Sequence, residues 1–474
     1  MNAFRPAFRA ALILAVGLAG VSASRAQTPS RDDEIAALRE QIRQLDQKLR
    51  VLERKQELKD EETAAAAKAA PKITTTDGRI EIASADGANS LRLRGLVQGD
   101  YRHYNAANDP ADSFLLRRAR LIFEGKFAKN FSYVVQPEFA GTVQILDAYV
   151  NAAINPAFQV RVGKFKTPVG LEQLQSDPVA FFNERSVATG LTPNRDVGLQ
   201  IWGEVLDNRL NYTLAVVNGV PDGGNNTNGT TDFDDNKVFA ARLFATPFAN
   251  DRESALSGLG VGIAASVGDF ETVSGRAANY RTDGQQTFFT YLTSTAAPAD
   301  NVNAAGRGVT VSPQAYFYRG PFGVLAEYVV SSIEVQRGGA GRIADVKNHG
   351  YNLAFGYVLT GEDSSYRGVV PKTSFNPAAG TWGAFEVVGR IAGVDIDDTV
   401  FTGPANLRLA NPNVSASALT TYGLGLNWYL SRSVRANFDV FHNEFELAPG
   451  ATPAANALIS DDETSFISRL QLSF

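Results

Sequence analysis

The chain has 474 residues, a formal net charge of −5 and no Cys. The absence of Cys excludes disulfides and thiolate metal sites, and the acidic total argues against a nucleic-acid-binding protein. A single Met, 42 Gly and 10% aromatic residues are more typical of a β-rich secreted protein than of a helical one.

Residues 1–26 have the pattern of a secretory signal peptide. Arg5 and Arg9 form a positively charged start, an apolar run covers 10–21, and Ser24-Arg25-Ala26 is a small-residue cleavage site. Removal of this segment takes away three arginines and no acid, which leaves −8 for the mature chain. No apolar run reaches the length of a membrane helix. We therefore expect an exported protein that, if embedded in a membrane, is a β-barrel.

Residues 32–60 predict a helix with a coiled-coil seam, and the Ala-rich stretch up to Pro71 predicts a linker, so that 27–70 form a periplasmic segment. Apolar residues follow the a and d positions at Ile35, Leu38, Ile42, Leu45, Leu49 and Leu52. Positions g and e would pair Glu34–Arg39, Lys48–Glu53 and Lys55–Asp60 in a parallel homo-oligomer. The alternative is a single amphipathic helix. The seam does not decide whether the coiled coil is a dimer or a trimer.

From residue 90 onward, alternating apolar and polar runs separated by turn residues predict sixteen strands. They are 90–104, 114–127, 131–140, 143–153, 157–165, 195–206, 209–218, 236–247, 258–270, 307–319, 322–335, 345–360, 381–397, 418–430, 432–447 and 464–474.

The connections between these runs fall into two classes. Odd-numbered ones are often long and even-numbered ones mostly tight, although 248–257 and 361–380 break the pattern. Long loops at one end and short turns at the other are typical of an outer-membrane barrel. We therefore expect an all-β fold, a sixteen-stranded antiparallel transmembrane β-barrel over 71–474, preceded by the coiled-coil helix. A soluble β-sandwich is the alternative for the last strand taken alone.

Strand alternation also predicts which charged side chains face the lumen. Eleven cations do so: Arg92, Arg94, Arg102, Arg118, Arg120, Lys126, Arg161, Arg242, Arg390, Arg435 and Arg469. Seven acids share that side: Asp100, Glu124, Glu138, Asp147, Glu204, Glu386 and Asp439. A net positive lumen in an acidic chain points to anion transport. Any single arginine could instead be paired with a carboxylate across strands and only support the wall.

Several segments resemble the phosphate-selective porin O and P family. They are GKFKTPVGLEQL (163–174), FFNERS (181–186), GYVLTGE (356–362), GLNWYL (425–430) and the ending RLQLSF. The resemblance implies a trimer of sixteen-stranded barrels in which a long loop folds into each pore. It also implies that Arg and Lys side chains line a narrow, anion-selective path.

The resemblance places Arg117 and Arg118 at the constriction. In a regular strand Arg118 and Arg120 face inward and Arg117 outward, so we expect a β-bulge that turns both members of the pair inward. Loop 166–194 is long enough to need a role, and Lys164 and Lys166 stand at its entrance. Together with Arg92, Arg94, Arg161 and the acid Asp147, these residues make up the expected anion pathway.

The function that we expect is passage of small inorganic anions, phosphate or polyphosphate, across the bacterial outer membrane, with no cofactor and no catalytic residues. The alternatives are a weakly selective porin and an outer-membrane tether whose coil contacts peptidoglycan. A barrel enzyme is disfavoured because the three His are isolated. Expected partners are further copies of the chain, membrane lipid and lipopolysaccharide. An acidic loop with Asp222, Asp232, Asp234 and Asp235 either binds divalent cations or is simply solvated.

Overall fold

The computed structural model describes residues 30–76, 79–226, 235–251, 253–270, 278–293, 300–338 and 341–474. They fall into two compact units that divide between Ala70 and Pro71. The expected signal peptide lies outside the described residues, as do Asp232 and Asp234. Among the helices of the described ranges, none is both long and apolar enough to cross a membrane.

The first unit contains one long helix, α1 (Arg31–Ala69). It begins with a capping box, in which the Ser30 side chain accepts from the Asp33 backbone N–H and the Asp33 carboxylate accepts from Ser30. The helix continues past the predicted end at residue 60 because the following residues are mostly Ala, the strongest helix former. The six seam residues are 41–64% exposed, so the described residues leave the apolar stripe of α1 largely uncovered.

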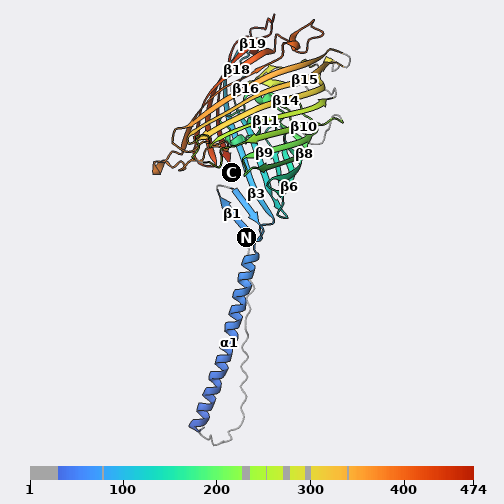
Figure 1. Cartoon of the computed structure of the whole chain (residues 1–474). Coiled ribbons are helices and arrows are strands. Elements are labelled where there is room, and N and C mark those ends of the chain that lie inside the picture. Colours follow the sequence, from blue (N-terminus) through green and yellow to red (C-terminus); the bar gives the residue numbers. More distant parts are fainter. Residues whose placement is uncertain are drawn as a thin grey trace, which may run out of the picture. The chain divides into compact units, whose positions relative to one another are not determined.

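The second unit is built on one antiparallel sheet of eighteen strands (Figure 1). Sixteen of those in the described ranges form the barrel: β3 (Ser90–Asn105), β4 (Ser113–Phe127), β5 (Phe131–Glu138), β6 (Gln144–Asn155), β7 (Phe158–Lys166), β8 (Arg195–Val205), β9 (Leu210–Val217), β10 (Val238–Ala245), β11 (Leu259–Phe270), β14 (Val302–Arg319), β15 (Phe322–Arg337), β16 (Ile343–Val358), β17 (Ala384–Asp395), β18 (Ala416–Tyr429), β19 (Val434–Leu447) and β20 (Glu463–Ser473).

Each barrel strand pairs with its neighbour along the chain, and β20 pairs with β3, which closes the barrel. The predicted strand number and antiparallel order are confirmed. Two additional strands, β1 (Lys72–Thr76) and β2 (Arg79–Ala83), form a hairpin that adds to β3 and that the sequence pattern did not indicate.

The expected alternation of faces is clear on β20. Ser465, Ile467 and Arg469 are buried, whereas Leu470 and Leu472 are 62% and 42% exposed on the outer surface. The Phe474 ring covers Gly95 of β3, where even a Cβ atom would meet the ring at 2.3 Å. Apolar side chains outside and polar ones inside are what a lipid-embedded barrel requires.

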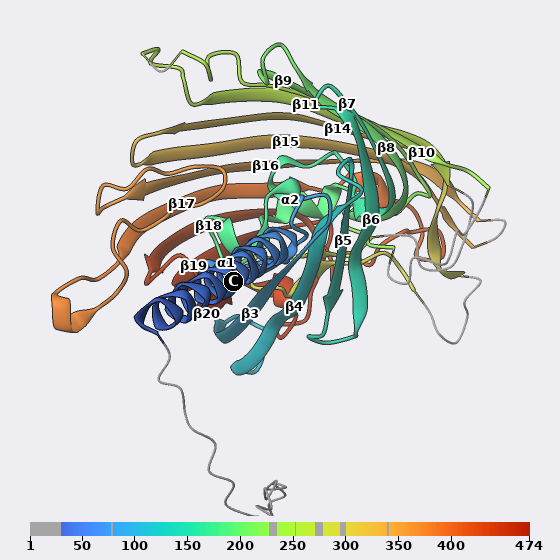
Figure 2. The same cartoon turned by 90° about the horizontal axis from the view of Figure 1, so that it is seen from below.

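Two segments enter the barrel from opposite ends. The connection 167–194 carries α2 (Leu171–Leu174), η1 (Asp177–Val179) and η2 (Val187–Leu191), and we call it the lumen loop. Figure 2 shows α2 inside the ring of strands. From the end that carries the short turns, Tyr366 of the 359–383 connection donates to the Leu171 carbonyl at 2.6 Å. The expected folding of the long loop into the barrel is therefore present.

Apolar contacts seat these segments against the wall. Leu171, Phe181 and Phe182 of the lumen loop pack against Leu325 and Phe441, together with other wall residues. A second cluster joins η2 to the small hairpin of β12 (Tyr280–Arg281) and β13 (Thr287–Phe289). One side of the interior is therefore a packed core, and the open space lies elsewhere in the lumen.

Candidate functional site

A β-bulge in β4 sets the positions of the paired arginines. Gln98 of β3 faces Arg118, but the next residue, Gly99, faces Leu116, so Arg117 is the extra residue of the bulge. The expected bulge is thus present. Arg117 donates from Nε to Glu184 at 2.6 Å, and Arg118 donates from Nη1 to Gln98 at 2.7 Å. Both side chains turn into the barrel.

Glu184 of the lumen loop forms ion pairs with arginines of three strands. Its carboxylate lies 2.8 Å from Arg102 Nη2, 3.0 Å from Arg469 Nη2 and 3.8 Å from Arg118 Nη2, in addition to the bond with Arg117. Burial alone would raise the pKa of Glu184, but these cations outweigh it and hold the pKa well below its usual range. Glu184 therefore stays ionised and ties the loop to the wall.

Asp177 of the same loop forms a second anchor. Its carboxylate lies 2.7 Å from Arg185 Nη1, and it also pairs with Arg120, which in turn reaches Glu138 at 2.6 Å. Burial opposes ionisation, yet the neighbouring guanidiniums, that of Arg118 first, keep the pKa of Asp177 well below its usual range. Removing one partner from such a buried pair is costly, because the other charge is left uncompensated.

A third anchor lies across the lumen. Arg390 of β17 bridges Glu172 of the lumen loop at 2.6 Å and Asp283 of the β12–β13 hairpin at 2.9 Å. The three anchors together contain seven cations, namely Arg102, Arg117, Arg118, Arg120, Arg185, Arg390 and Arg469. Six carboxylates balance them: Asp100, Glu138, Glu172, Asp177, Glu184 and Asp283. Within these ion-paired anchors the charges are therefore nearly balanced.

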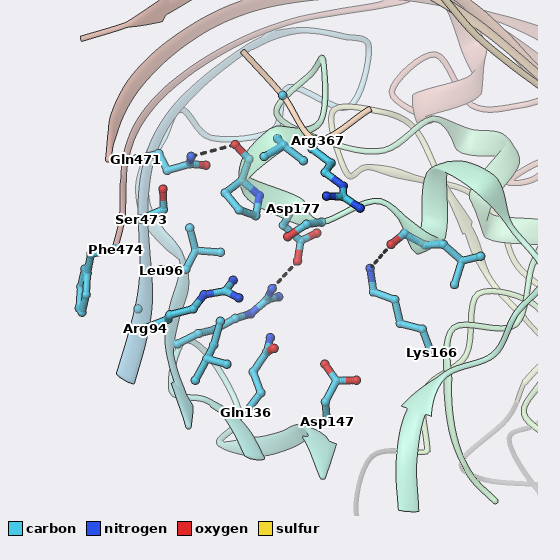
Figure 3. A pocket seen from close by; sticks show the side chains of 18 of the residues that line it. Arg94, Leu96, Gln136, Asp147, Lys166, Asp177, Arg367, Gln471, Ser473 and Phe474 are labelled. Carbon is cyan, nitrogen blue, oxygen red and sulfur yellow. Dashed lines mark hydrogen bonds and ion pairs between the residues drawn. The ribbon is translucent and has the colours of Figure 1, made fainter. Parts of the chain in front are cut away.

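Beside this network lies a cavity of about 710 Å³ (Figure 3). Ten cations line it: Arg79, Arg94, Arg120, Arg161, Lys166, Arg195, Arg242, Arg367, Arg432 and Arg435. Only two of its lining residues, Asp147 and Asp177, are acids. Fixed positive charge in a narrow space bounded by protein attracts anions more strongly than the same charge in bulk water.

The residues predicted for the anion pathway divide between the cavity and its surroundings. Five of them line the cavity: Arg94, Arg120, Arg161, Lys166 and Asp147. The other four lie outside its lining and have other contacts. Arg117 and Arg118 contact Glu184, Arg92 pairs with Glu81 of β2 at 2.7 Å, and Lys164 donates to the Ile145 carbonyl at 2.7 Å.

Lys166 and Asp147 are also occupied by protein groups. Lys166 Nζ donates to the carbonyls of Gln173 and Gln175 at 2.7 and 2.9 Å, so it closes the lumen loop on itself. Asp147 accepts from Arg195 Nε at 3.1 Å. The role of these residues in anion passage stays a prediction.

Sequence reasoning missed four of the cavity's cations. Arg79 belongs to the unpredicted hairpin, Arg195 begins β8, and Arg432 lies in a turn. Arg367 lies in the 359–383 connection, and the unusual length of that connection was the one available signal. Alternation along strands cannot find Arg367 and Arg432, because turn and loop residues have no fixed face.

Besides Arg435, whose Cζ lies 4.9 Å from the centre of the Tyr429 ring, two cavity arginines are held by aromatic rings. Arg161 Cζ lies 4.2 Å from the centre of the Tyr149 ring and 5.6 Å from that of Trp202. Arg242 Cζ lies 4.4 Å from the centre of Phe244. Within the described part of the chain, neither guanidinium contacts a carboxylate. A ring orients a guanidinium without cancelling its charge, so these two arginines contribute undiminished positive charge.

A closed barrel of sixteen antiparallel strands, with an inserted loop and a charged lumen, is an outer-membrane porin. Residues 91–474 match the model of the family described as Phosphate-selective porin O and P. The chain belongs to this family, which consists of transport channels and not enzymes, and its location is the bacterial outer membrane. The resemblance seen in the sequence is confirmed.

Individual relatives are distant. Porin O of Pseudomonas aeruginosa is 24% identical over 433 residues, which are 85% of this chain and 92% of that protein. Among solved structures, a loop L8 deletion mutant of OmpT, an outer-membrane protein of Vibrio cholerae, matches with a TM-score of 0.51 and 10% identity, over 82% of this chain and 100% of its own. In vitro folded OmpT in trimer form has a TM-score of 0.50, with the same identity and coverage. These structural matches bear on the fold alone.

Proposed function

We propose that this porin passes small inorganic anions, phosphate or polyphosphate, through its arginine- and lysine-lined lumen. The observation that carries the proposal is the excess of ten cations over two acids around the cavity. An anion that enters loses part of its hydration, and fixed guanidinium groups replace that hydration with charge-assisted hydrogen bonds. The description of the family as phosphate-selective supports this choice of solute.

A weakly selective porin is the second candidate. It is favoured by the near balance of charge in the anchors of the lumen loop, where seven cations meet six carboxylates. If the loop level controls permeation, the local field is weak there, and selectivity depends on the cavity alone. The two candidates therefore differ in which level of the lumen limits ion flow.

The oligomer that we propose is a trimer reinforced by α1. OmpT, which shares the fold, has been described in trimer form. The exposed seam of α1 and its complementary g and e charges favour parallel association of copies. We also propose that the coil contacts peptidoglycan and that the barrel contacts lipopolysaccharide.

Reversal potentials in planar bilayers test the solute class. The purified protein would be placed between unequal concentrations of potassium chloride, phosphate, pyrophosphate or sulfate. The proposal predicts an anion preference in every salt and a larger one for phosphate or pyrophosphate than for chloride. An anion preference that is small and equal for all four salts supports the weakly selective porin instead.

A further inference from the structure

Arg161 and Arg242, two of the three cavity arginines that lie over aromatic rings, have hydrogen-bonding capacity that the protein does not use. Arg161 Nε is buried and has no hydrogen-bond partner among the described residues. Arg242 donates from Nε to Gln314 at 3.0 Å, which leaves its two terminal nitrogens for another acceptor. By contrast, Arg435 donates to the carbonyls of Ala180 and Phe181, and the anchor arginines bind carboxylates.

The wall between Arg161 and Arg242 contains neutral groups. Arg161 of β7 is paired with Gln200 of β8, and Arg242 of β10 is paired with Thr213 of β9. Between them, Trp202 of β8 is paired with Thr213. All five residues line the cavity. The strands β7 and β10 are three strand spacings apart, which is about 14 Å. The cavity-lining residues between the two arginines on this wall are therefore uncharged.

The chemistry of a guanidinium on a ring favours a particular shape of ligand. Its plane presents a row of N–H donors at the edge, which matches the two oxygens of a carboxylate. Among the described residues, Arg242 lies over one ring, that of Phe244, which leaves its opposite face for a flat group of the ligand. Arg161 has the rings of Tyr149, Trp202 and Phe165 within 6.0 Å, so it offers a ligand its edge. A cavity of about 710 Å³ is in the size range that accepts organic molecules and is far larger than one phosphate ion requires.

We propose that the arginine–aromatic wall, defined as Arg161, Arg242, Tyr149, Trp202 and Phe244, is a binding site for planar organic anions, in particular aromatic carboxylates. The carboxylate binds the edge of a guanidinium, and the aromatic ring of the ligand stacks on the face of Arg242 opposite Phe244. This deepens the proposed function and rests on it, because it requires that anions enter the lumen.

The test compares two monovalent acids of similar size, benzoate, which is flat, and cyclohexanecarboxylate, which is not. Each is added to channels that carry chloride current in planar bilayers, and the concentration that halves the current is measured. We expect benzoate to block at a concentration about three- to tenfold lower, the size of a stacking contact with a cation. Equal half-blocking concentrations in the unmodified protein would overturn the proposal.

Two double variants test whether a preference for benzoate depends on the arginine–aromatic wall. Arg161→Lys with Arg242→Lys retains both charges but removes both planes, and Tyr149→Leu with Phe244→Leu removes the supporting rings. Each double variant should bring the ratio of half-blocking concentrations close to one. The control Phe438→Leu removes a ring that is 41% exposed on the outer surface and should leave the ratio unchanged. A ratio that persists in the double lysine variant contradicts the proposal, even if the ring variant fails to assemble.

A further measurement in the same bilayers distinguishes failure of this inference from failure of the proposed function. Reversal potentials in a potassium chloride gradient are measured before either acid is added. If chloride is not preferred over potassium, the proposed function fails, and this inference fails with it. If chloride is preferred but benzoate and cyclohexanecarboxylate block equally, only the arginine–aromatic wall is refuted.

Discussion

Arg117 Nε lies 2.6 Å from the Glu184 carboxylate, although regular alternation along β4 would turn Arg117 toward the lipid. The bulge that makes this contact possible brings a wall strand and the lumen loop together. Because Glu184 also meets Arg102 and Arg469, one carboxylate joins three strands to the loop. Loss of this charge should therefore change both the loop and the field in the lumen.

We predict that Glu184→Gln destabilises the loop and increases anion selectivity. The carboxamide keeps the size of the side chain but leaves buried guanidinium groups without their counter-charge, which costs about 3–5 kcal/mol. The measurements are the thermal midpoint in detergent and the reversal potential in a salt gradient. Asp207→Asn is the control, because Asp207 is 85% exposed in a turn and its pair with Arg209 at 3.9 Å contributes little. An unchanged thermal midpoint in Glu184→Gln would show that the anchor has no structural role.

Removal of Arg118 and Arg120 together should lower anion selectivity. Both are changed to Ala, and Asp177 then faces the lumen with fewer cations around it. Adding Asp177→Asn should restore part of the selectivity, because it removes the carboxylate left exposed. Reversal potentials of the double and triple variants decide between two roles. If Asp177→Asn restores nothing, Arg118 and Arg120 act on the ion directly and not by neutralising Asp177.

The stability of the folded protein should depend on pH through the buried carboxyl group of Asp222. This group accepts from Ser331 Oγ at 2.6 Å and from Tyr280 Oη at 3.3 Å, and burial raises its pKa to about 7. The folded protein thus holds a proton that the unfolded chain releases near pH 4. The stability contributed by the neutral acid is complete below the unfolded pKa and is lost as pH rises through about 7.

The matching variant is Asp222→Asn, which imitates the protonated acid. We expect it to raise stability at pH 8 by about 1–2 kcal/mol and to change little at pH 4.5. Thermal midpoints at the two pH values check this. A gain of the same size at both pH values would mean that the effect does not come from ionisation of Asp222.

Deletion of residues 32–60 should weaken the oligomer while the barrel remains folded. The seam of α1 is exposed in the single chain, and α1 belongs to a compact unit separate from the barrel. Sedimentation or cross-linking after gentle extraction measures the oligomer, and resistance to denaturation by detergent reports on the barrel. A truncated protein that is entirely monomeric would show that the coil, and not the barrel surface, is the main contact.

Much of the barrel could be read from the sequence because a strand with one lipid face and one lumen face has a strict period of two. The boundaries agree closely for most strands, as at β4, predicted over 114–127 and found over Ser113–Phe127. The largest difference is at β14, predicted from residue 307 and found from Val302. A register shift between Ala304 and Gly308 interrupts the alternation there, so the pattern could not be followed further back.

The site was less predictable for a physical reason. Counting the charges that face the lumen gave a positive interior, but the count omitted the acids of the lumen loop. Asp177 and Glu184 neutralise the arginines of β4, and this pairing depends on the folded path of the loop. The support of Arg161 by Tyr149 on a neighbouring strand is likewise a tertiary contact. Residue types and alternation therefore indicate which side chains face inward, but not which charges remain uncompensated.

The central claim is that cavity arginines without a carboxylate partner, Arg161 and Arg242, give the lumen its preference for anions. The most direct test measures the reversal potential in a potassium chloride gradient for the unmodified protein and for Arg161→Gln with Arg242→Gln. These substitutions remove two charges and leave every anchor of the lumen loop in place. We predict a clear preference for chloride over potassium in the unmodified protein and a marked loss of it in the variant. A preference of unchanged size in the variant, or none in the unmodified protein, would contradict the claim.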